Sequence, residues 1–431
     1  MKQINREILS IAVPSIVTNI TTPLLALMDV VIVGHMGGAD YIAAIAVGGT
    51  IFNMIYWLFA FLRMGSSGLT AQAYGAGNRS ECDMVLQRGL LVVVTASVLM
   101  IACQIPIFRL AGFLFEIKDN IREMVSDYFT ILIWGAPASL GAFVVSGWFL
   151  GQKDARTPMR VAFVINISNI VISLLLVYGF GMKISGVALG TLCAQWLGFI
   201  VAISAAIRKY RPQAASAIRL FEPHELKRFF SININIFFRT LCLIAVTVWF
   251  TRTGSSQGTD ILAVNTLLMQ FFTLFSYFMD GFAFAGESLC GNYIGKKDSD
   301  GLRATVSALF RWSILMVAIF TLVYALAGNG IMTLLSDDPG VILSSKEFFA
   351  WVIAIPAVGF ATFTWDGIFI GATRTREMLM SIAAATAIYF ITYTLLFPKL
   401  GNHGLWIAFL AYLLTRGLVL TLLRHRLYKP G

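Results

Sequence analysis

The residue best placed to do chemistry in this sequence is a carboxylic acid inside an apolar stretch. Asp29 is the single charged residue between Ile8 and Val33. An ionised carboxylate in hydrocarbon costs at least about 2.5 kcal/mol, so it persists only where it faces protein or water. Such residues usually mark ion or proton pathways, and the alternative is a buried acid kept neutral or paired for structure. We expect Asp29 to be functional.

The residues around this acid suggest how it is presented. Thr22 and Asp29 are seven residues apart and therefore fall on one stripe of a helix. Pro14 and Pro23 interrupt the backbone hydrogen bonds of the same segment, which membrane helices tolerate as kinks. Two interpretations stay open: protonation of Asp29 bends the helix at these prolines, or the helix is permanently bent.

Other polar side chains recur at helical spacing within apolar segments. In the first half they are Asn166, Asn169 and Ser173 on one predicted helix face, and Thr191 and Gln195 one turn apart on the next segment. Uncharged polar side chains between membrane helices often act only in packing, at about 0.6 kcal/mol each. We favour that role for Asn166 and Gln195, while Asn169 and Thr191 stay open.

The second half carries acids of its own. Asp280 and Glu287 are seven residues apart on one predicted helix face, and a solvated position near the membrane surface is the alternative for Glu287. Buried opposite charges should pair, so we expect Arg239 with Asp366, and Arg63 with Asp280 or Glu287. Candidates for the substrate cavity or its gates are Thr22, Met28, Asn166, Gln195, Tyr277, Asp280, Phe284, Glu287 and Asp366.

The composition places these residues in membrane helices. Of 431 residues 58% are hydrophobic and 13% charged, about half the charged fraction of a soluble domain. Apolar windows of about 20 residues recur along the chain, so we predict an all-α membrane protein with twelve spans. They cover 8–33, 41–71, 84–108, 124–150, 159–180, 187–207, 229–251, 261–290, 303–327, 346–371, 378–398 and 404–424. The spans 41–71 and 261–290 are long enough to require tilting, kinking or extension past the bilayer.

The net charge of +10 indicates orientation rather than nucleic-acid binding. With the N-terminus inside, 22 of the 32 lysines and arginines lie in predicted inside segments and 7 in outside segments. This asymmetry matches the positive-inside rule. We therefore predict a multi-pass protein of the cytoplasmic (inner) membrane, with both termini in the cytoplasm.

Two halves of the chain repeat each other at an offset of 220 residues. Asp40–Ala43 matches Asp260–Ala263, and Gly75 matches Gly295. The match is weak per residue but keeps its register across six spans, which predicts two pseudo-symmetric six-helix lobes. The predicted domains are an N-lobe over 1–207, a basic linker over 208–228 and a C-lobe over 229–431.

Several function classes have no signal in the sequence. There is no nucleotide-binding fingerprint, nucleophile elbow, histidine cluster or channel-filter motif. The five cysteines are scattered and form no ligand-spaced set. We expect no enzyme activity, no cofactor and no metal centre.

Five stretches then identify a family resemblance. They are Ala12-Val13-Pro14, Leu27 to Gly34, Ala71 to Asn78, Gly147 to Met159 and Asp280 to Glu287. In this order and spacing the chain resembles the multidrug and toxic compound extrusion (MATE) family over nearly its whole length, and most of all its DinF-like branch. The resemblance implies a V-shaped carrier that exports amphipathic, often cationic drugs or toxic compounds in exchange for H⁺ or Na⁺. A carrier with two lobes can work as a monomer, and we expect one here.

The resemblance also implies roles for individual residues. The helix-1 acid of the family corresponds to Asp29, and the proline implicated in bending corresponds to Pro14. The family's cation site uses an asparagine and a threonine that correspond to Asn169 and Thr191, but its second acid is replaced by Ser173. A Na⁺ site with one carboxylate should be weak. We therefore favour H⁺ coupling, with protonation of Asp29 linked to substrate release.

A different cargo is the main alternative. Arg63, Arg239 and Arg416 are predicted within membrane spans, and a basic cavity would suit an organic anion or a lipid-linked cargo on the same architecture.

Overall fold

The computed structural model describes residues 2–34, 39–213, 220 and 222–428. All regular secondary structure in these residues is helical. Twelve helical segments in this part of the chain are long and apolar enough to cross a membrane. The predicted all-α fold with twelve spans is confirmed, although most helices extend beyond the apolar windows by a few residues.

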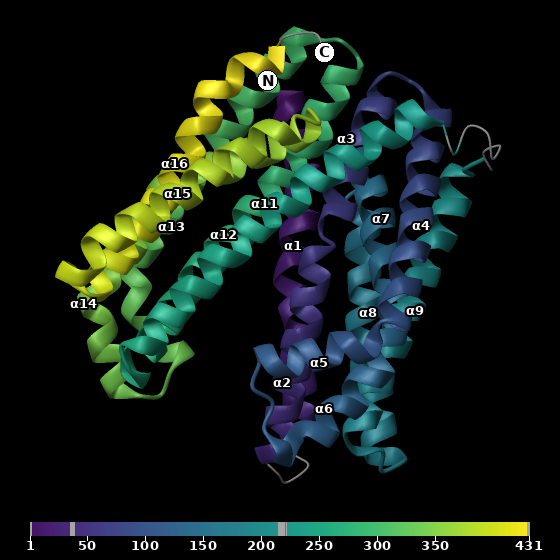
Figure 1. Ribbon diagram of the computed structural model, residues 1–431. Coiled ribbons are helices and arrows are strands. Elements are labelled where there is room, and N and C mark those ends of the chain that lie inside the picture. The colour runs from purple at the N-terminus through teal and green to yellow at the C-terminus, as the bar shows by residue number, and fades with distance from the viewer. Residues whose placement is uncertain (1, 35–38, 214–219, 221, 429–431) are drawn as a thin grey trace. The chain divides into compact units, whose positions relative to one another are not determined.

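The chain divides into two compact units (Figure 1). The first unit is Val17–Phe230, and the second combines Met1–Ile16 with Ser231–Gly431. The divisions fall inside two helices, α1 and α11. Helices of the first unit are α1 (Lys2–Gly34, shared), α2 (Ala39–Leu58), α3 (Phe61–Gly75), α4 (Arg79–Ala102), α5 (Gln104–Leu114), α6 (Asp119–Leu132), η1 (Ile133–Gly135), α7 (Ala136–Gly151), α8 (Arg156–Leu174), the π-helix η2 (Leu175–Gly179) and α9 (Lys183–Tyr210).

The second unit has longer uninterrupted helices. They are α11 (Pro223–Ser256, shared), α12 (Thr259–Gly295), α13 (Ser299–Leu335), α14 (Pro339–Gly371), α15 (Thr375–Leu400), α16 (Asn402–Leu423) and η3 (Arg424–Tyr428). The two spans predicted to be overlong accommodate their length differently. The first breaks at Phe59–Ala60 into α2 and α3, whereas the second continues as the 37-residue helix α12.

Close helix contacts repeat in both units at the predicted offset of 220. A Cβ atom on Gly147 would lie 2.2 Å from the carbonyl oxygen of Arg63, and one on Gly367 would lie 2.1 Å from that of Ala283. These glycines allow α7 to approach α3, and α14 to approach α12, with backbones in contact. Gly147 and Gly367 are 220 residues apart, and so are Arg63 and Ala283. The repeat predicted from the sequence is therefore present in the packing.

Gly151 and Gly371 extend the same pattern by one turn. Their Cβ atoms would lie 2.8 Å from the Ser67 carbonyl oxygen and 2.5 Å from the Glu287 carbonyl oxygen. Each unit therefore holds a small-x-x-x-small pair at the same place.

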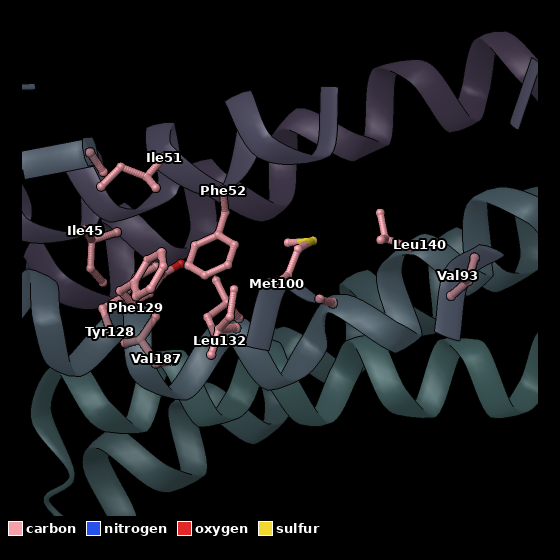
Figure 2. Packing of buried hydrophobic residues seen from close by; sticks show 14 of the residues in the cluster. Ile45, Ile51, Phe52, Val93, Met100, Tyr128, Phe129, Leu132, Leu140 and Val187 are labelled. Carbon is pink, nitrogen blue, oxygen red and sulfur yellow. The ribbon is translucent and has the colours of Figure 1, made fainter. Parts of the chain in front are cut away.

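Apolar side chains fill each unit separately. In the first unit the rings of Phe52 and Phe129 lie 5.3 Å apart between centroids, and Tyr128 meets Phe52 edge-on at 6.4 Å (Figure 2). In the second unit Phe271 meets Tyr324 edge-on at 5.1 Å. Offset and edge-on aromatic pairs of this kind stabilise a core beyond their buried area.

The glycine contacts generate a first prediction. Gly147→Ala and Gly367→Ala should each lower the free energy of unfolding by about 1–3 kcal/mol, because a methyl group would force two helices apart. Gly49→Ala and Gly330→Ala are matched controls, since a Cβ at either position meets nothing within 4 Å. Thermal denaturation of the purified protein in detergent measures the difference. Equal midpoints for all four variants would contradict the packing role.

Candidate functional site

Three predicted coupling residues form one hydrogen-bonded chain across three helices. Asp29 of α1 is 3% exposed, and its Oδ2 accepts from the Thr191 hydroxyl of α9 at 3.3 Å. Thr191 Oγ1 in turn accepts from the Asn169 side-chain amide of α8 at 2.9 Å. The family resemblance implied Asn169 and Thr191 as partners of Asp29, and the fold brings both residues into one hydrogen-bonded chain with it.

The Thr191 hydroxyl has two competing acceptors. Its oxygen lies 3.0 Å from the Val187 carbonyl oxygen as well as 3.3 Å from Asp29 Oδ2. A hydroxyl has one proton to donate. An ionised Asp29 can only accept, so it competes with Val187 for that proton. A protonated Asp29 can donate to Thr191 Oγ1, which leaves the threonine proton for Val187.

Three oxygens of this cluster have no hydrogen-bond partner among the described residues. They are Asp29 Oδ1, Asn169 Oδ1 and Ser173 Oγ. Ser173 is fully buried and packs against Gly190, where a Cβ would lie 2.1 Å from its Oγ. The glycine next to Thr191 thus lets α8 approach α9 closely. Buried polar atoms normally find a partner, so unpartnered oxygens around a carboxyl are suited to bind H⁺, water or a cation.

Two features near this site were not predicted from the sequence. The π-helix η2 follows Ser173 at Leu175–Gly179, and such turns are frequent at functional sites. Tyr178 within it donates to the Ile32 carbonyl oxygen of α1 at 3.0 Å. Leu175–Gly179 is an ordinary apolar run with a terminal glycine, so no sequence signal marks the change of helix type.

Other candidates from α1, α8 and α9 lie outside this hydrogen-bonded chain. Thr22 donates to the Thr18 carbonyl of its own helix at 2.9 Å. Asn166 donates to the Thr21 carbonyl oxygen at 2.9 Å, which matches the packing role favoured for it. Gln195 packs on Gly135, where a Cβ would lie only 1.9 Å from its Oε1. Met28 is half-buried. A cavity or gating role for these four residues stays a prediction.

The two prolines of α1 differ in their surroundings. Pro14 is buried and Pro23 is exposed. Pro14 belongs to the part of α1 that packs in the second unit, where a Cβ on Gly281 would lie 2.9 Å from the Ala12 carbonyl oxygen. The boundary between the two compact units follows directly after Ile16. Helix α1 is continuous past both prolines, and bending at either remains a prediction.

The second unit holds a buried ion triad. Asp366 Oδ2 accepts from Arg239 and from Arg416 Nη2, the latter at 2.6 Å. All three side chains are buried. The predicted pairing of Arg239 with Asp366 is confirmed, whereas the second arginine was not assigned from the sequence. One carboxylate between two guanidinium groups leaves a net charge of +1.

The remaining candidates of the second unit lie on α12. Glu287 is 1% exposed, which rules out the solvated position considered for it. Asp280, Tyr277 and Phe284 are half-buried. The pairing proposed for Arg63 stays a prediction.

Aromatic residues replace the polar cluster at the corresponding positions of the second unit. The counterparts of Asp29, Asn169 and Ser173 at the offset of 220 are Trp249, Tyr389 and Tyr393. Trp249 meets Tyr393 edge-on at 5.9 Å, and Tyr393 stacks on Tyr389 at 6.4 Å. The polar cluster around Asp29 therefore has no equivalent at these positions of the second unit.

Comparison with known proteins gives consistent matches over the whole chain. The MatE family model matches residues 14–175 and 232–395. The chain is 36% identical to DNA damage-inducible protein F of Escherichia coli K12, over 98% of this chain and 92% of that protein. It is 24% identical to multidrug resistance protein MdtK of Edwardsiella ictaluri, over 97% and 94%.

Solved structures share the fold at lower identity. A crystal structure of MATE in the bent conformation aligns with a TM-score of 0.86 and 19% identity, over 99% of this chain and 97% of that one. A MOP superfamily transporter from Pyrococcus furiosus aligns with a TM-score of 0.86 and 17% identity, over 98% and 96%.

The geometry predicts different effects on stability for the two buried carboxyls, Asp29 and Asp366. Asp366→Leu should lower the free energy of unfolding by about 3–5 kcal/mol, because two buried guanidinium groups lose their partner. Asp29→Asn should change it by less than about 1 kcal/mol, because an amide oxygen still accepts from Thr191. Thermal denaturation in detergent measures both. A loss for Asp29→Asn as large as for Asp366→Leu would indicate that Asp29 serves stability.

Proposed function

The chain belongs to the MatE family, and from this premise we propose that it is a secondary antiporter that exports amphipathic organic cations in exchange for H⁺. The observation that carries the proposal is the Asp29 carboxyl, which is buried, hydrogen-bonded on one oxygen and unpartnered on the other among the described residues. The named relatives include a multidrug resistance protein. Membership of this family favours transport over catalysis.

Proton exchange at Asp29 supplies the coupling step. The ionised carboxyl favours a state of the carrier that holds a cationic substrate, because the buried charge needs a counter-charge. A proton from outside neutralises the carboxyl and removes that requirement. The Thr191 hydroxyl then turns from Asp29 to the Val187 carbonyl oxygen. Protonation and substrate occupancy are thereby mutually exclusive, which is the requirement for antiport.

Sodium is the less favoured coupling ion. The oxygens of Asn169, Ser173 and Thr191 could take part in binding a cation at Asp29, but they add no negative charge. Hard cations are held by several oxygens together with compensating charge. A site with one carboxylate therefore binds Na⁺ weakly, whereas a single carboxyl suffices for one proton.

The charge distribution supports a location in the bacterial cytoplasmic membrane with both termini inside. Basic residues concentrate in the loops predicted to face the cytoplasm. A two-lobed carrier can act as a monomer, and we propose that this one does.

Export of an organic anion or a lipid-linked cargo is the second candidate. The triad of Arg239, Asp366 and Arg416 favours it, because its net positive charge is buried within the second unit. An anionic cargo would provide the missing negative charge.

The coupling role of Asp29 is testable by efflux. Assays on inverted membrane vesicles or whole cells of a pump-deficient host should show ethidium export driven by a pH gradient. Asp29→Asn should abolish this export, because the asparagine side chain cannot take up and release a proton. Asp127→Asn is the matched control, since Asp127 is exposed on α6 and its variant should export normally. Unchanged export by Asp29→Asn would disprove the mechanism.

Ser173→Ala distinguishes the two coupling ions. The variant removes an unpartnered oxygen next to Gly190 without adding volume. With H⁺ coupling, export under a pH gradient should stay within about twofold of wild type, because the lost hydroxyl carries no charge. Export that follows a Na⁺ gradient in wild type and disappears in Ser173→Ala would overturn the choice of H⁺. A protein that moves no cationic dye under either gradient would favour the anionic cargo.

A further inference from the structure

A cavity of about 410 Å³ lies between α8 and α9 of the first unit, at the end where α8 begins and α9 finishes. Three basic residues line it, namely Arg160, Arg208 and Lys209. All three are exposed. The two helices pack side by side along their length (Figure 1), so the cavity sits where a membrane-spanning pair emerges from the hydrocarbon.

Only part of this positive charge is neutralised. Lys209 Nζ lies 2.7 Å from Asp154 Oδ2, which also accepts from the Thr157 hydroxyl at 2.6 Å. Burial raises the pKa of the Asp154 carboxyl, but hydrogen bonds from Lys209 and Thr157 outweigh it and leave the pKa below its ordinary value. The Lys209–Asp154 pair is therefore ionised and neutral overall.

The two arginines keep their charge available. Within the described part of the chain Arg160 and Arg208 form no ion pair, and no acidic residue lines the cavity. Guanidinium groups match phosphate geometry because they offer several donors in one plane. Together they give the cavity a net charge of +2 that a phosphate group would neutralise.

Apart from Thr157, the rest of the lining is apolar. Val161 follows Arg160 on α8, and Val201 and Ala205 lie one to two turns before Arg208 on α9. Beyond them the two helices carry large exposed apolar residues such as Ile167 and Ile200. A molecule in this cavity thus meets cationic groups at one end and an apolar surface towards the membrane interior.

We propose that the cavity binds the headgroup of an anionic phospholipid, with Arg160 and Arg208 contacting its phosphate and the acyl chains lying along α8 and α9. Basic pockets between membrane helices at the cytoplasmic side bind such headgroups. Free phosphate has the same charge chemistry, but it makes no use of the apolar lining. The proposal rests on the membrane spans and is independent of which ion drives transport.

Lipid retention by the purified full-length protein tests the proposal. The protein is extracted in mild detergent, supplied with equal amounts of phosphatidylglycerol and phosphatidylethanolamine, and analysed by native mass spectrometry. Wild type should retain phosphatidylglycerol preferentially. Arg160→Gln combined with Arg208→Gln should reduce that retention about tenfold or more, as expected for two basic residues that contact an anionic headgroup.

A second double variant controls for charge. Arg156→Gln with Arg424→Gln removes the same charge from exposed positions that do not line the cavity, and it should retain the lipid as wild type does. Because all four arginines are exposed, each variant is expected to elute as a folded monodisperse protein, and Arg208→Gln alone provides a milder test.

Three outcomes would overturn the proposal. The first is that wild type shows no preference for phosphatidylglycerol. The second is that both double variants lose the preference equally, which would indicate that the lipid is attracted to the basic surface as a whole. Alternatively, millimolar inorganic phosphate would displace the lipid completely in wild type and bind equally well in lipid-free protein, which identifies a soluble-anion site. Efflux is not part of this readout, so failure of the transport mechanism would leave the result unchanged.

Discussion

The hydrogen bond between the Thr191 hydroxyl and the Asp29 carboxyl joins the buried acid of α1 to the helix pair α8 and α9. A buried carboxylate is unfavourable unless it is paired, protonated or near a cation. Here it is held by a neutral hydroxyl on one oxygen, and its other oxygen has no protein partner in the described residues. No guanidinium of the first unit forms an ion pair with it within these residues, in contrast to Asp366. The site is consequently left dependent on a proton or a cation, which is what coupling requires.

The two units share the same close helix packing but differ in the chemistry of their buried acids. Gly147 and Gly367 bring equivalent helices into backbone contact, so the scaffold is repeated. At the positions equivalent to Asp29 and Ser173, however, the second unit packs Trp249 against Tyr393. One of its buried acids, Asp366, lies in an ion triad. One unit therefore carries a buried acid without an ion-pair partner among the described residues, and the other carries an acid paired with two arginines.

Much of this arrangement follows from the sequence because hydrophobic length and repeat spacing are strong signals. The twelve spans and the Arg239–Asp366 pair were predicted correctly, since apolar windows and buried opposite charges leave few alternatives. The partner role of Arg416, the π-helix after Ser173 and the close contact of Ser173 with Gly190 were not predicted. Each depends on the axial and rotational register of one helix against its neighbour. Helical spacing places side chains on a face but does not fix that register.

The most direct test of the account is proton release on substrate binding. Purified protein in weakly buffered detergent is mixed with ethidium at neutral pH, and the change in pH is followed with an indicator dye. If substrate and proton compete for Asp29, wild type should release up to one proton per bound ethidium, and Asp29→Asn should bind the dye without release. Equal proton release by both proteins, or binding by wild type with no release and a dependence on Na⁺, would contradict the account.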